Sequence, residues 1–496
     1  MRADAKGFAR YQLPTYEVAS GRAQVLNIPM VLPVDLRQIT VSDNAKVEVD
    51  PSSNAGALVL RKSELEALSD DRTDLAVDLQ ALAGPAAGPN GGQVFIDGFT
   101  GGRLPSKQSI REVRINQNPF AAQFDKPGQG RIEIFTKPGA DEFHGQLVFQ
   151  FSDAALNSRN PFADTKPPFQ RRQWEGEFSG PLRKKTSFFF DFERKDTSEN
   201  AFINATILDS NLQVTPFSQA VVTPVTGVEM NFKLDHQLTA NHTLAGRFTY
   251  ARDTNDNQGV GGFSLVSRGY ANRDTENTWQ VTETGVLNAR TVNETRFRYR
   301  RQGSNQNGTN SAPTINVLDA FVSGGSPQLL AYTNQDRFEL QNFTTLVSGR
   351  HNFRWGGLLR GISLDDRATQ NYAGTFTFTS LNSYRLTVLG VQRGLTPDQI
   401  RASGGGASQF SISGGDPVAA IRQTDFGFFL QDDWKLRPNF TLSGGLRYEA
   451  QTHTGDRRDF GPRIGFAWDW EALMARRRRT RSVADLACST TAWAKA

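Results

Sequence analysis

The amino-acid sequence predicts a mainly β fold: a transmembrane antiparallel β-barrel with a small mixed α+β domain in front of it. Apolar and polar residues alternate over many stretches of the chain. Several of these stretches reach the roughly 9–11 residues that a tilted membrane strand needs. No run of about 20 apolar residues is present, which excludes a bundle of transmembrane helices. The mean hydropathy of -0.48 is compatible with strands that have one apolar and one polar face.

The first 55 residues differ from the rest. Residues 1–40 contain short β-like stretches separated by proline, enough for the end of a sandwich domain but not for a whole one. Residues 41–55 are polar and linker-like. The chain starts without the apolar core and small-residue cleavage site of a secretory signal. Read literally, this start predicts that the chain is not exported.

Residues 62–83 have helical character. The spacing of three, four and seven residues between leucines predicts one helix over this range. Ser63 and Glu66 form a capping-box pattern, and Gly84 is a helix stop. The leucines of this pattern are Leu65, Leu68, Leu75, Leu79 and Leu82.

Short strands complete the small domain. The segments QVFIDGF, SIREVRINQNPF and GRIEIFTKPG are apolar, β-like and separated by glycine and proline turns. The small mixed domain ends near Gly139 in this interpretation.

From about residue 141 the alternation becomes uniform. In EFHGQLVFQFS the residues Leu147, Phe149 and Phe151 share one face, and in QWEGEFS the residues Trp174 and Phe178 share one face. Successive strand side chains point to opposite faces, so each such stretch has one apolar and one polar side. Later stretches repeat the pattern, with an apolar face at Phe428, Leu430, Leu442, Leu446 and Tyr448.

A soluble β-sandwich is the alternative to a barrel. The strands favour the barrel because they are long and carry aromatic residues near their ends, where membrane barrels have aromatic girdles. Long polar segments at 252–279 and 301–335 resemble the long loops on one side of such barrels. Alternation alone leaves both architectures open.

Charge and composition exclude several kinds of function. The net charge is +5, but most of it lies in residues 471–496, so a basic groove for nucleic acid is not supported. The single cysteine, Cys488, lies in the same tail, and the five histidines are scattered. The sequence therefore predicts no metal site, no cofactor, no catalytic residues and no enzymatic activity.

The segment Gln93–Gly145 resembles the plug domain of TonB-dependent outer-membrane receptors. It is most similar to the Oar-like group, whose members carry an N-terminal carboxypeptidase-regulatory-like domain. Stretches such as FGFFLQDDWKLRPNFTLSGGLRYE and DFGPRIGFAWDW resemble barrel strands of the same group. The matching plug residues are Asp97, Gly98, Ile110, Glu112, Val113, Asn118, Pro119, Phe120, Gly128, Gly130, Arg131, Thr136, Lys137, Gly139, His144 and Gly145.

The resemblance implies a domain order. Residues 1–40 would end a regulatory-like β-sandwich domain, 41–140 would form the plug, and 141–470 would form part of an outer-membrane β-barrel that has 22 strands in the family. Residues 471–496 would be an irregular basic tail. Because about 330 residues follow the plug and the alternation stops after Trp470, we expect a truncated copy with the tail out of frame.

The resemblance also implies a function. A scarce solute would bind at the cell surface, and a periplasmic TonB-type protein would pull on a segment before the plug so that the solute passes the outer membrane. The solute is not identified. The alternative is a surface or secretion-associated barrel that acts as an interaction protein without uptake.

Two sets of site residues follow from the resemblance. The first is the TonB-contact segment Gln38, Ile39, Thr40, Val41, Ser42 and Asp43, which could instead be the last strand of the preceding domain. The second is a set of charges that would pair plug with barrel, unless they are solvated surface charges worth about 0–1 kcal/mol each. This second set consists of Arg111, Arg114 and Arg131 on the plug and Glu175 and Glu177 on the barrel.

Overall fold

The chain has two compact units, Met1–Glu48 and Val49–Ala496. In the first unit the short strands β1 (Arg2–Ala3) and β2 (Tyr11–Gln12) pair antiparallel. The predictions for the rest of residues 1–40, for 38–43 and for the tail 471–496 lie outside the described residues. The computed structural model describes residues 2–3, 11–12, 58–84, 92–116, 120–126, 128, 130–158, 166, 168–308, 310–327, 329–455 and 458–468.

A small α+β domain begins the second unit. Its five-stranded sheet has the order β3-β6-β7-β4-β5, in which β4 and β7 are parallel and the other neighbours antiparallel. A short 3-10 helix, Lys107–Ser109, precedes β6. The strands are β3 (Leu58–Arg61), β4 (Val94–Ile96), β5 (Phe99–Thr100), β6 (Ile110–Ile115) and β7 (Ile132–Thr136).

The predicted single helix over 62–83 is wrong, because the segment forms two helices, α1 (Ser63–Glu66) and α2 (Arg72–Ala83). The predicted capping box is also absent: Lys62 is the N-cap of α1, and no side chain caps it. The second helix starts at Asp71, whose carboxylate accepts a hydrogen bond from the backbone N–H of Thr73. Gly84 ends this helix at φ 78°, which agrees with the predicted stop.

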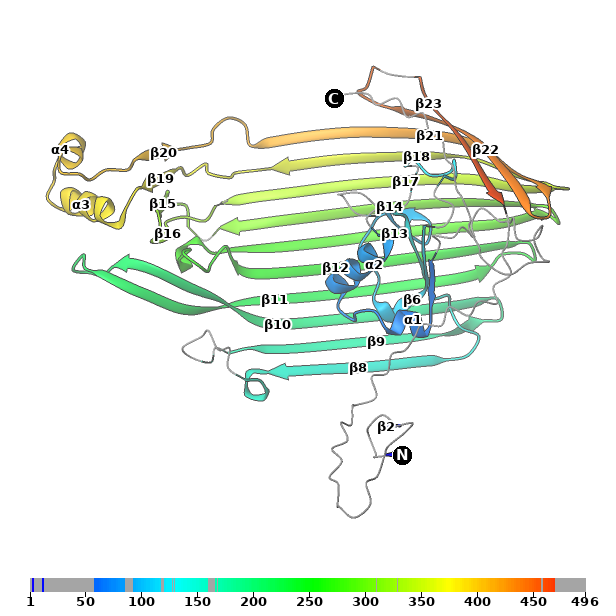
Figure 1. Ribbon diagram of the computed structural model, residues 1–496, viewed down its shortest axis with the longest axis horizontal. Coiled ribbons are helices and arrows are strands. Elements are labelled where there is room, and N and C mark those ends of the chain that lie inside the picture. Colours follow the sequence, from blue (N-terminus) through cyan, green and yellow to red (C-terminus); the bar gives the residue numbers. More distant parts are fainter. Residues whose placement is uncertain are drawn as a thin grey trace, which may run out of the picture. The chain divides into compact units, whose positions relative to one another are not determined.

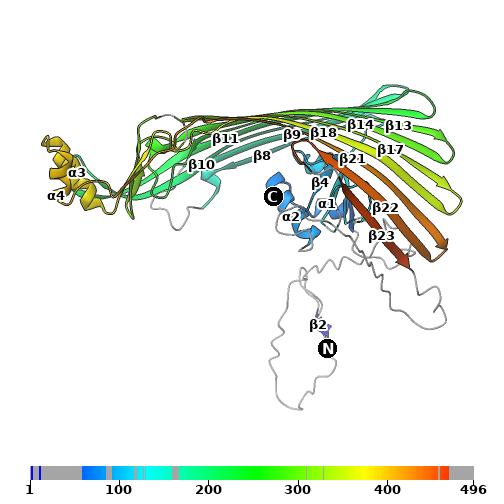
Figure 2. The ribbon, with the colours of Figure 1, turned by 90° about the horizontal axis from the view of Figure 1, so that it is seen from above.

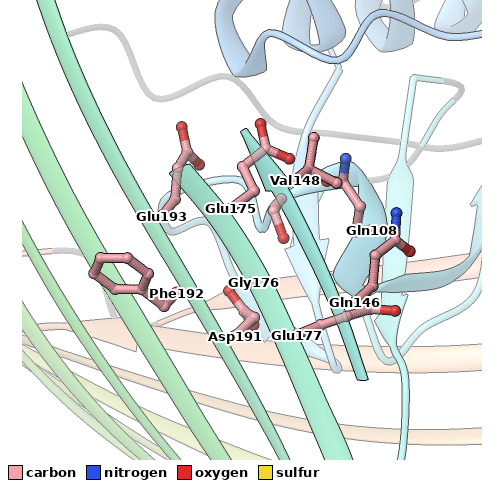
Figure 3. Close-up of a pocket in the computed structure, with 10 residues that line it drawn as sticks. Gln108, Gln146, Val148, Glu175, Gly176, Glu177, Asp191, Phe192 and Glu193 are labelled. Carbon is pink, nitrogen blue, oxygen red and sulfur yellow. The ribbon is translucent and has the colours of Figure 1, made fainter. Parts of the chain in front are cut away.

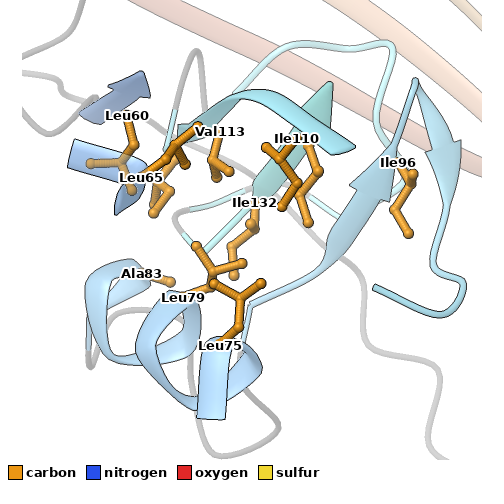
Figure 4. Packing of buried hydrophobic residues seen from close by; sticks show 11 residues of the cluster. Leu60, Leu65, Leu75, Leu79, Ala83, Ile96, Ile110, Val113 and Ile132 are labelled. Atoms are coloured by element: carbon orange, nitrogen blue, oxygen red, sulfur yellow. The ribbon is translucent and has the colours of Figure 1, made fainter. Parts of the chain in front are cut away.

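The α+β domain has its own apolar core (Figure 4). Leu75 and Leu79 of α2 pack against Ile132 and Val113 of the sheet, all at most 1% exposed. The domain therefore buries much of its apolar surface internally, while Phe99 and Ala122 are buried outside this cluster, next to Arg298 and Gly445 of the large sheet.

Twelve antiparallel strands form the large sheet (Figure 1). The sheet is curved, most strongly toward β22 and β23 (Figure 2). Among the described residues β8 and β23 are its edges. In spatial order the strands are β8 (His144–Asp153), β9 (Gln170–Arg183), β10 (Thr186–Leu208), β11 (Val214–Gln237), β12 (His242–Gln258), β13 (Tyr270–Asn288), β14 (Thr291–Gly308), β17 (Leu330–Ser348), β18 (His351–Arg367), β21 (Val418–Arg437), β22 (Phe440–Gln451) and β23 (Asp459–Trp468).

The two faces of this sheet differ as the alternation predicts. Leu147 is 72% exposed, and Trp174, Phe178, Phe428 and Leu430 are also exposed. Exposed apolar side chains in such numbers are typical of a surface that meets lipid. We call the opposite face, which carries Glu175, Asp191 and Arg447 among its buried polar residues, the inner face.

The strands are longer than predicted. The segments 252–279 and 301–335, expected as loops, lie partly in strands of the large sheet: 252–258 in β12, 270–279 in β13, 301–308 in β14 and 330–335 in β17. The far ends of these strands carry polar side chains on both faces. The sequence there has no alternation of apolar and polar residues, so a strand cannot be distinguished from a loop. Strands β10 and β11 extend furthest: beyond Ser198, β10 pairs only with β11 in its ladder.

A second, smaller layer is built from the long connections. Its four-stranded sheet has the order β16-β15-β19-β20, and its buried residues, among them Val317 and Phe321, pack against Ile203 of the extended β10. We call it the loop layer. It consists of β15 (Thr314–Val317), β16 (Phe321–Ser323), β19 (Thr375–Phe378), α3 (Leu381–Gln392), α4 (Pro397–Ala402) and β20 (Gln409–Ser411).

Candidate functional site

The candidate site is the interface between the α+β domain and the inner face of the large sheet. Two partly buried arginines of the domain share one buried carboxylate there: Arg72 and Arg103 both contact Glu229 of β11, which is 3% exposed. Arg72 also lies 2.7 Å from Glu193, and Arg103 pairs with Asp253. In ion pairs that are removed from water, each charge depends strongly on its partner, because no solvent can replace a partner that is lost.

Asp71 links the start of α2 to the sheet. Its carboxylate caps the helix and lies 2.8 Å from the ammonium of Lys195 on β10. The Lys195 hydrogen bond, opposed by partial burial, lowers the pKa of Asp71 from 3.8 to about 2. The charged carboxylate is therefore favoured in the docked, folded state.

This pKa predicts an acid-sensitive contact. The folded-state pKa is below the unfolded one, so Asp71 contributes stability above about pH 4 and loses it as the pH falls toward about 2. We expect hydrogen exchange of α2 to accelerate in this pH range, and the acceleration to be smaller in Asp71→Asn, which keeps a capping oxygen but no charge. Asp74→Asn in the same helical turn is the control, and equal pH profiles in the two variants would contradict the prediction.

The predicted plug residues Asp97 and Gly98 form the tight turn between β4 and β5. Both have positive φ, 48° and 82°. The Asp97 carboxylate accepts hydrogen bonds from the backbone N–H and hydroxyl of Thr136, and it lies 3.1 Å from Arg247 on β12. Burial alone would raise the pKa of Asp97, but Arg247 and the Thr136 hydrogen bonds outweigh it and lower the pKa. This turn therefore joins two strands of the domain to the sheet.

Gly98 is required for more than its turn. A Cβ at this position would stand 1.9 Å from Nη1 of Arg296, whose guanidinium donates to the Gly98 carbonyl at 3.2 Å. We expect Gly98→Ala to displace Arg296 and to weaken docking of the domain by about 1–3 kcal/mol beyond the cost of the positive φ. Gly101→Ala is the matched control, because Gly101 also has positive φ but no atom near its Cβ position. Similar urea dependence of protease cleavage for the two variants would contradict this expectation.

Arginines of β14–β23 hold the other side of the domain by its backbone. Arg298 donates to the carbonyls of Thr100 and Gly101 at 2.7 and 3.0 Å. Arg447 donates to Ala122 and Gln123 at 3.2 and 3.1 Å. Guanidinium groups present several donors in a fixed geometry, which suits a loop rich in carbonyl oxygens.

Asp125 is the acidic contact on that side. Its carboxylate lies 2.8 Å from Arg360 of β18. Burial works to raise the pKa of Asp125, and the Arg360 guanidinium outweighs it, so the pKa lies below its usual value. The domain thus places basic side chains against β10 and β11, and carbonyl and carboxylate oxygens against β14–β23.

An acidic cavity of about 20 Å³ lies between Ser106 and Gln108 of the domain and strands β8–β10 (Figure 3). Glu175 and Glu193 are direct cross-strand neighbours there. Glu175 accepts a hydrogen bond from Gln173, but its other carboxylate oxygen has no partner among the described residues.

The charges predicted to join plug and barrel have different partners. Arg111 and Arg114 both contact Glu112 within the α+β domain, where the sequence predicts barrel partners. Arg131 is buried, lies 3.6 Å from Glu133, and stacks on Phe124. Glu112 lies between the two arginines on strand β6. Its carboxylate is therefore nearer to both guanidinium groups in the chain than any carboxylate of the large sheet.

Other predicted residues fall close to the interface or outside the described residues. Glu177 pairs with Lys137 of the domain at 3.3 Å. The backbone N–H of Gly130 donates to the Asn116 side chain. Phe120 is partly buried, whereas Asn118 and Pro119 are outside the described part of the chain.

Most interface residues were missed from the sequence: Arg72, Arg103 and Asp125 of the domain, and the arginines of the sheet. On the strands, these residues could have been found from the sequence, because charged residues recur at every second position opposite an apolar face. Examples are Arg296, Arg298 and Arg300 of β14. On the domain no local pattern distinguishes them.

The described residues contain neither a candidate metal site nor a helix that could cross a membrane. No group of three or more histidine, cysteine, aspartate or glutamate side chains there could hold a metal ion. None of the helices in that part of the chain has the length and apolar character needed to cross a membrane.

Comparison with known proteins identifies the large sheet. A family model described as "Outer membrane beta barrel domain" matches residues 135–231 and 224–459. No curated protein matches the chain.

Solved structures with a similar fold include outer-membrane receptors and a transporter. The siderophore receptor PirA from Pseudomonas aeruginosa is 13% identical with a TM-score of 0.52, over 84% of this chain and 59% of PirA. The outer membrane transporter YddB from Escherichia coli is 11% identical with a TM-score of 0.57, over 84% and 59%. A mutant of the ferric enterobactin receptor PfeA from P. aeruginosa is 14% identical with a TM-score of 0.56, over 84% and 60%. At these identities the likeness is one of fold, and the chain spans about 60% of the length of these structures.

Proposed function

Because this chain belongs to the outer membrane β-barrel domain family, we propose that it is a TonB-dependent receptor that takes up a solute across the outer membrane, with the α+β domain as its movable plug. We place the plug at 41–140 and the barrel at 141–470, and the plug motif within Gln93–Gly145 supports membership of the Oar-like group, with 1–40 as the end of its regulatory-like domain. The solute is not identified.

The nature of the interface carries the proposal. The α+β domain has its own apolar core and meets the inner face mainly through ion pairs and hydrogen bonds, with smaller apolar contacts at Phe99 and Ala122. Water can replace such contacts when the surfaces separate, whereas an apolar interface would expose its surface at a high cost. The domain can therefore leave the wall as a folded or partly folded body.

The proposed partner is a TonB-type protein that binds Gln38–Asp43. An extended segment of this kind binds by adding a strand to the edge of a partner's sheet. Deleting Gln38–Asp43 is expected to abolish energised movement of the domain and to leave the amount of protein in the outer membrane unchanged.

A disulfide between plug and wall tests the proposal. A Cβ at Gly445 of β22 would stand 2.9 Å from the Cβ of Ala122, shorter than the roughly 3.5–4.5 Å of a disulfide, so a bridge forms here once the two backbones move apart by about 1 Å. In a Cys488→Ser background, Ala122→Cys alone is labelled with a maleimide dye in source cells, with and without an uncoupler. We expect more labelling in energised cells, because movement exposes this position.

The double variant Ala122→Cys/Gly445→Cys provides the matched control. Its oxidised form should resist labelling in both conditions, and reduction should restore the difference. Equal labelling of the single variant in energised and uncoupled cells would contradict the plug proposal.

The loop layer favours a second candidate, a surface interaction protein without uptake. Its core is shared with β10 and β11, and Val391 of α3 and Leu395, which follows that helix, are exposed. Deletion of Gln38–Asp43 distinguishes the two candidates, because it abolishes the first function and spares the second.

A further inference from the structure

The inner face of β14–β23 carries several arginines that form no ion pair with a carboxylate on the same strands, among the residues that the structure describes. Three arginines of this face have a carboxylate partner on a barrel strand: Arg296 pairs with Glu294, Arg298 with Glu339, and Arg447 with Glu449. Five others make no ion pair with a barrel carboxylate among the described residues. These five are Arg300, Arg337, Arg354, Arg360 and Arg463.

Two of the five have no partner. Arg300 of β14 and Arg337 of β17 are direct cross-strand neighbours, and Arg300 is only 7% exposed. Neither makes a hydrogen bond or ion pair with any residue that the structure describes, and their Nε atoms are buried without a partner. Like charges placed directly opposite one another destabilise a sheet. An anion between them would remove this repulsion.

The acids nearest to this pair are already engaged. Glu276 accepts hydrogen bonds from Thr278 and Gln302, and Glu339 pairs with Arg298 at 2.6 Å. The two guanidinium groups therefore remain available to a ligand that carries its own negative charge.

The other three arginines have hydrogen-bond and ion-pair partners on the plug, and Arg360 also stands directly across the strands from Glu339 and Asp425. Arg354 donates to the Gln123 side chain at 2.6 Å, Arg360 pairs with Asp125 at 2.8 Å, and Arg463 donates to the carbonyl of Ala121 at 2.5 Å. All these partners lie within Ala121–Asp125, so movement of that segment frees the three together. Before this movement, the Asp125 carboxylate occupies the position at Arg360 where a carboxylate of a ligand would bind.

We propose that the solute is an anion with carboxylate or phosphate groups, and that Arg300, Arg337 and Arg360 bind it, with Asp125 holding Arg360 in the resting state. The inference rests on the proposed function, because it names the class of solute that passes this wall. The three residues are contiguous: Arg337 faces Ile362 of β18, two positions from Arg360 on the same face. Guanidinium groups bind carboxylate and phosphate oxygens through paired hydrogen bonds, which gives them preference over neutral solutes.

The opposite wall supports the same class of solute. Glu175, Glu177, Asp191 and Glu193 gather on β9 and β10 around the acidic cavity. Glu193 pairs with Arg72 and Glu177 with Lys137 in the described state, so movement of the plug would leave these acids unpaired, and they would then repel an anion toward β14–β23.

Calorimetry on the purified full chain tests the proposal, with citrate and inorganic phosphate as separate probes at matched ionic strength. We expect at least one of the two probes to bind. Comparison of their affinities shows whether the site prefers carboxylate or phosphate groups. Arg337→Gln should weaken binding about tenfold, the usual effect of one charge-assisted contact. Asp125→Asn should strengthen it, because it releases Arg360.

The matched control is Arg301→Gln, the next residue after Arg300, which lies on the outer face near Asp336. It should bind like the parent chain. If Arg337→Gln fails to fold, as judged by circular dichroism, Arg300→Lys is used instead: it keeps the charge but loses the paired donors, and should also weaken binding.

Binding of neither probe, or equal binding by the parent chain and the inner-face variant, would overturn the inference. The result is separable from the proposed function, since calorimetry needs neither energy nor movement. A chain that binds citrate but shows no energised labelling of position 122 would retain the anion site and lose the uptake proposal.

Discussion

Glu229→Gln is expected to release the α+β domain from the sheet. Glu229 is shared by Arg72 and Arg103, and removing its charge leaves two guanidinium groups facing a neutral amide in a buried site. Breaking a buried ion pair by neutralising one partner costs about 3–5 kcal/mol. The measurement is the urea concentration at which protease cleaves the α+β domain in the otherwise intact protein. We expect the variant to be cleaved at much lower urea.

Glu199→Gln is the matched control, because Glu199 lies on the neighbouring strand β10 but is exposed. It should behave like the parent chain. Identical cleavage of both variants would mean that Glu193 and Asp253 satisfy the two arginines without Glu229, and that the shared carboxylate does not hold the domain.

Leu79→Ala is expected to unfold the α+β domain. Leu79 is 1% exposed and lies in the apolar core between α2 and the five-stranded sheet. Truncation of a buried leucine commonly costs about 2–5 kcal/mol, through lost burial and the cavity that remains. Hydrogen exchange of β6 and β7 should accelerate in this variant, while exchange in the twelve-stranded sheet should not change.

The control on the same helix is Leu82→Ala, at a position that is 40% exposed. Its effect should stay well below that of the buried position, since most of its side chain already meets solvent. Comparable exchange in the two leucine variants would show that α2 does not stabilise the domain through its buried face.

The two effects are physically distinct. The Glu229 variant removes contacts between the domain and the wall and leaves the apolar core intact, so the domain should be released while folded. The Leu79 variant removes core packing and leaves the ion pairs available. Because Ala122 is buried against the wall, release of the folded domain in the glutamate variant should raise maleimide labelling at position 122 in uncoupled cells. The leucine variant should raise this labelling only if unfolding of the core also breaks that contact.

Several features of the fold could be predicted because their cause is local. Leu147, Phe149 and Phe151 recur at every second residue, and this spacing alone places them on one face of a strand. The sequence Asp97–Gly98 between two apolar runs predicts a tight turn, since these residue types tolerate positive φ. Gly84 predicts the end of a helix for the same reason.

Other features were wrong or missed because their cause is not local. The break between α1 and α2 depends on Asp71, whose side chain caps the start of α2. The leucine spacing continues through the break and gives no sign of it. The polar outer parts of β12–β17 form strands because neighbouring strands pair with them, and pairing leaves no trace in a segment that is polar on both faces.

The sequence by itself determined the class of fold, the apolar side of each strand and the tight turn at Asp97–Gly98, since periodicity and turn chemistry act between residues close in the chain. The tertiary structure decided which charges meet. Arg111 and Arg114 have their partner Glu112 on the same strand, while Arg72, Arg103 and Asp125 reach Glu229, Asp253 and Arg360, more than 100 positions away. Charge pairing depends on distance in space, and only the docking of the α+β domain on the curved sheet sets those distances.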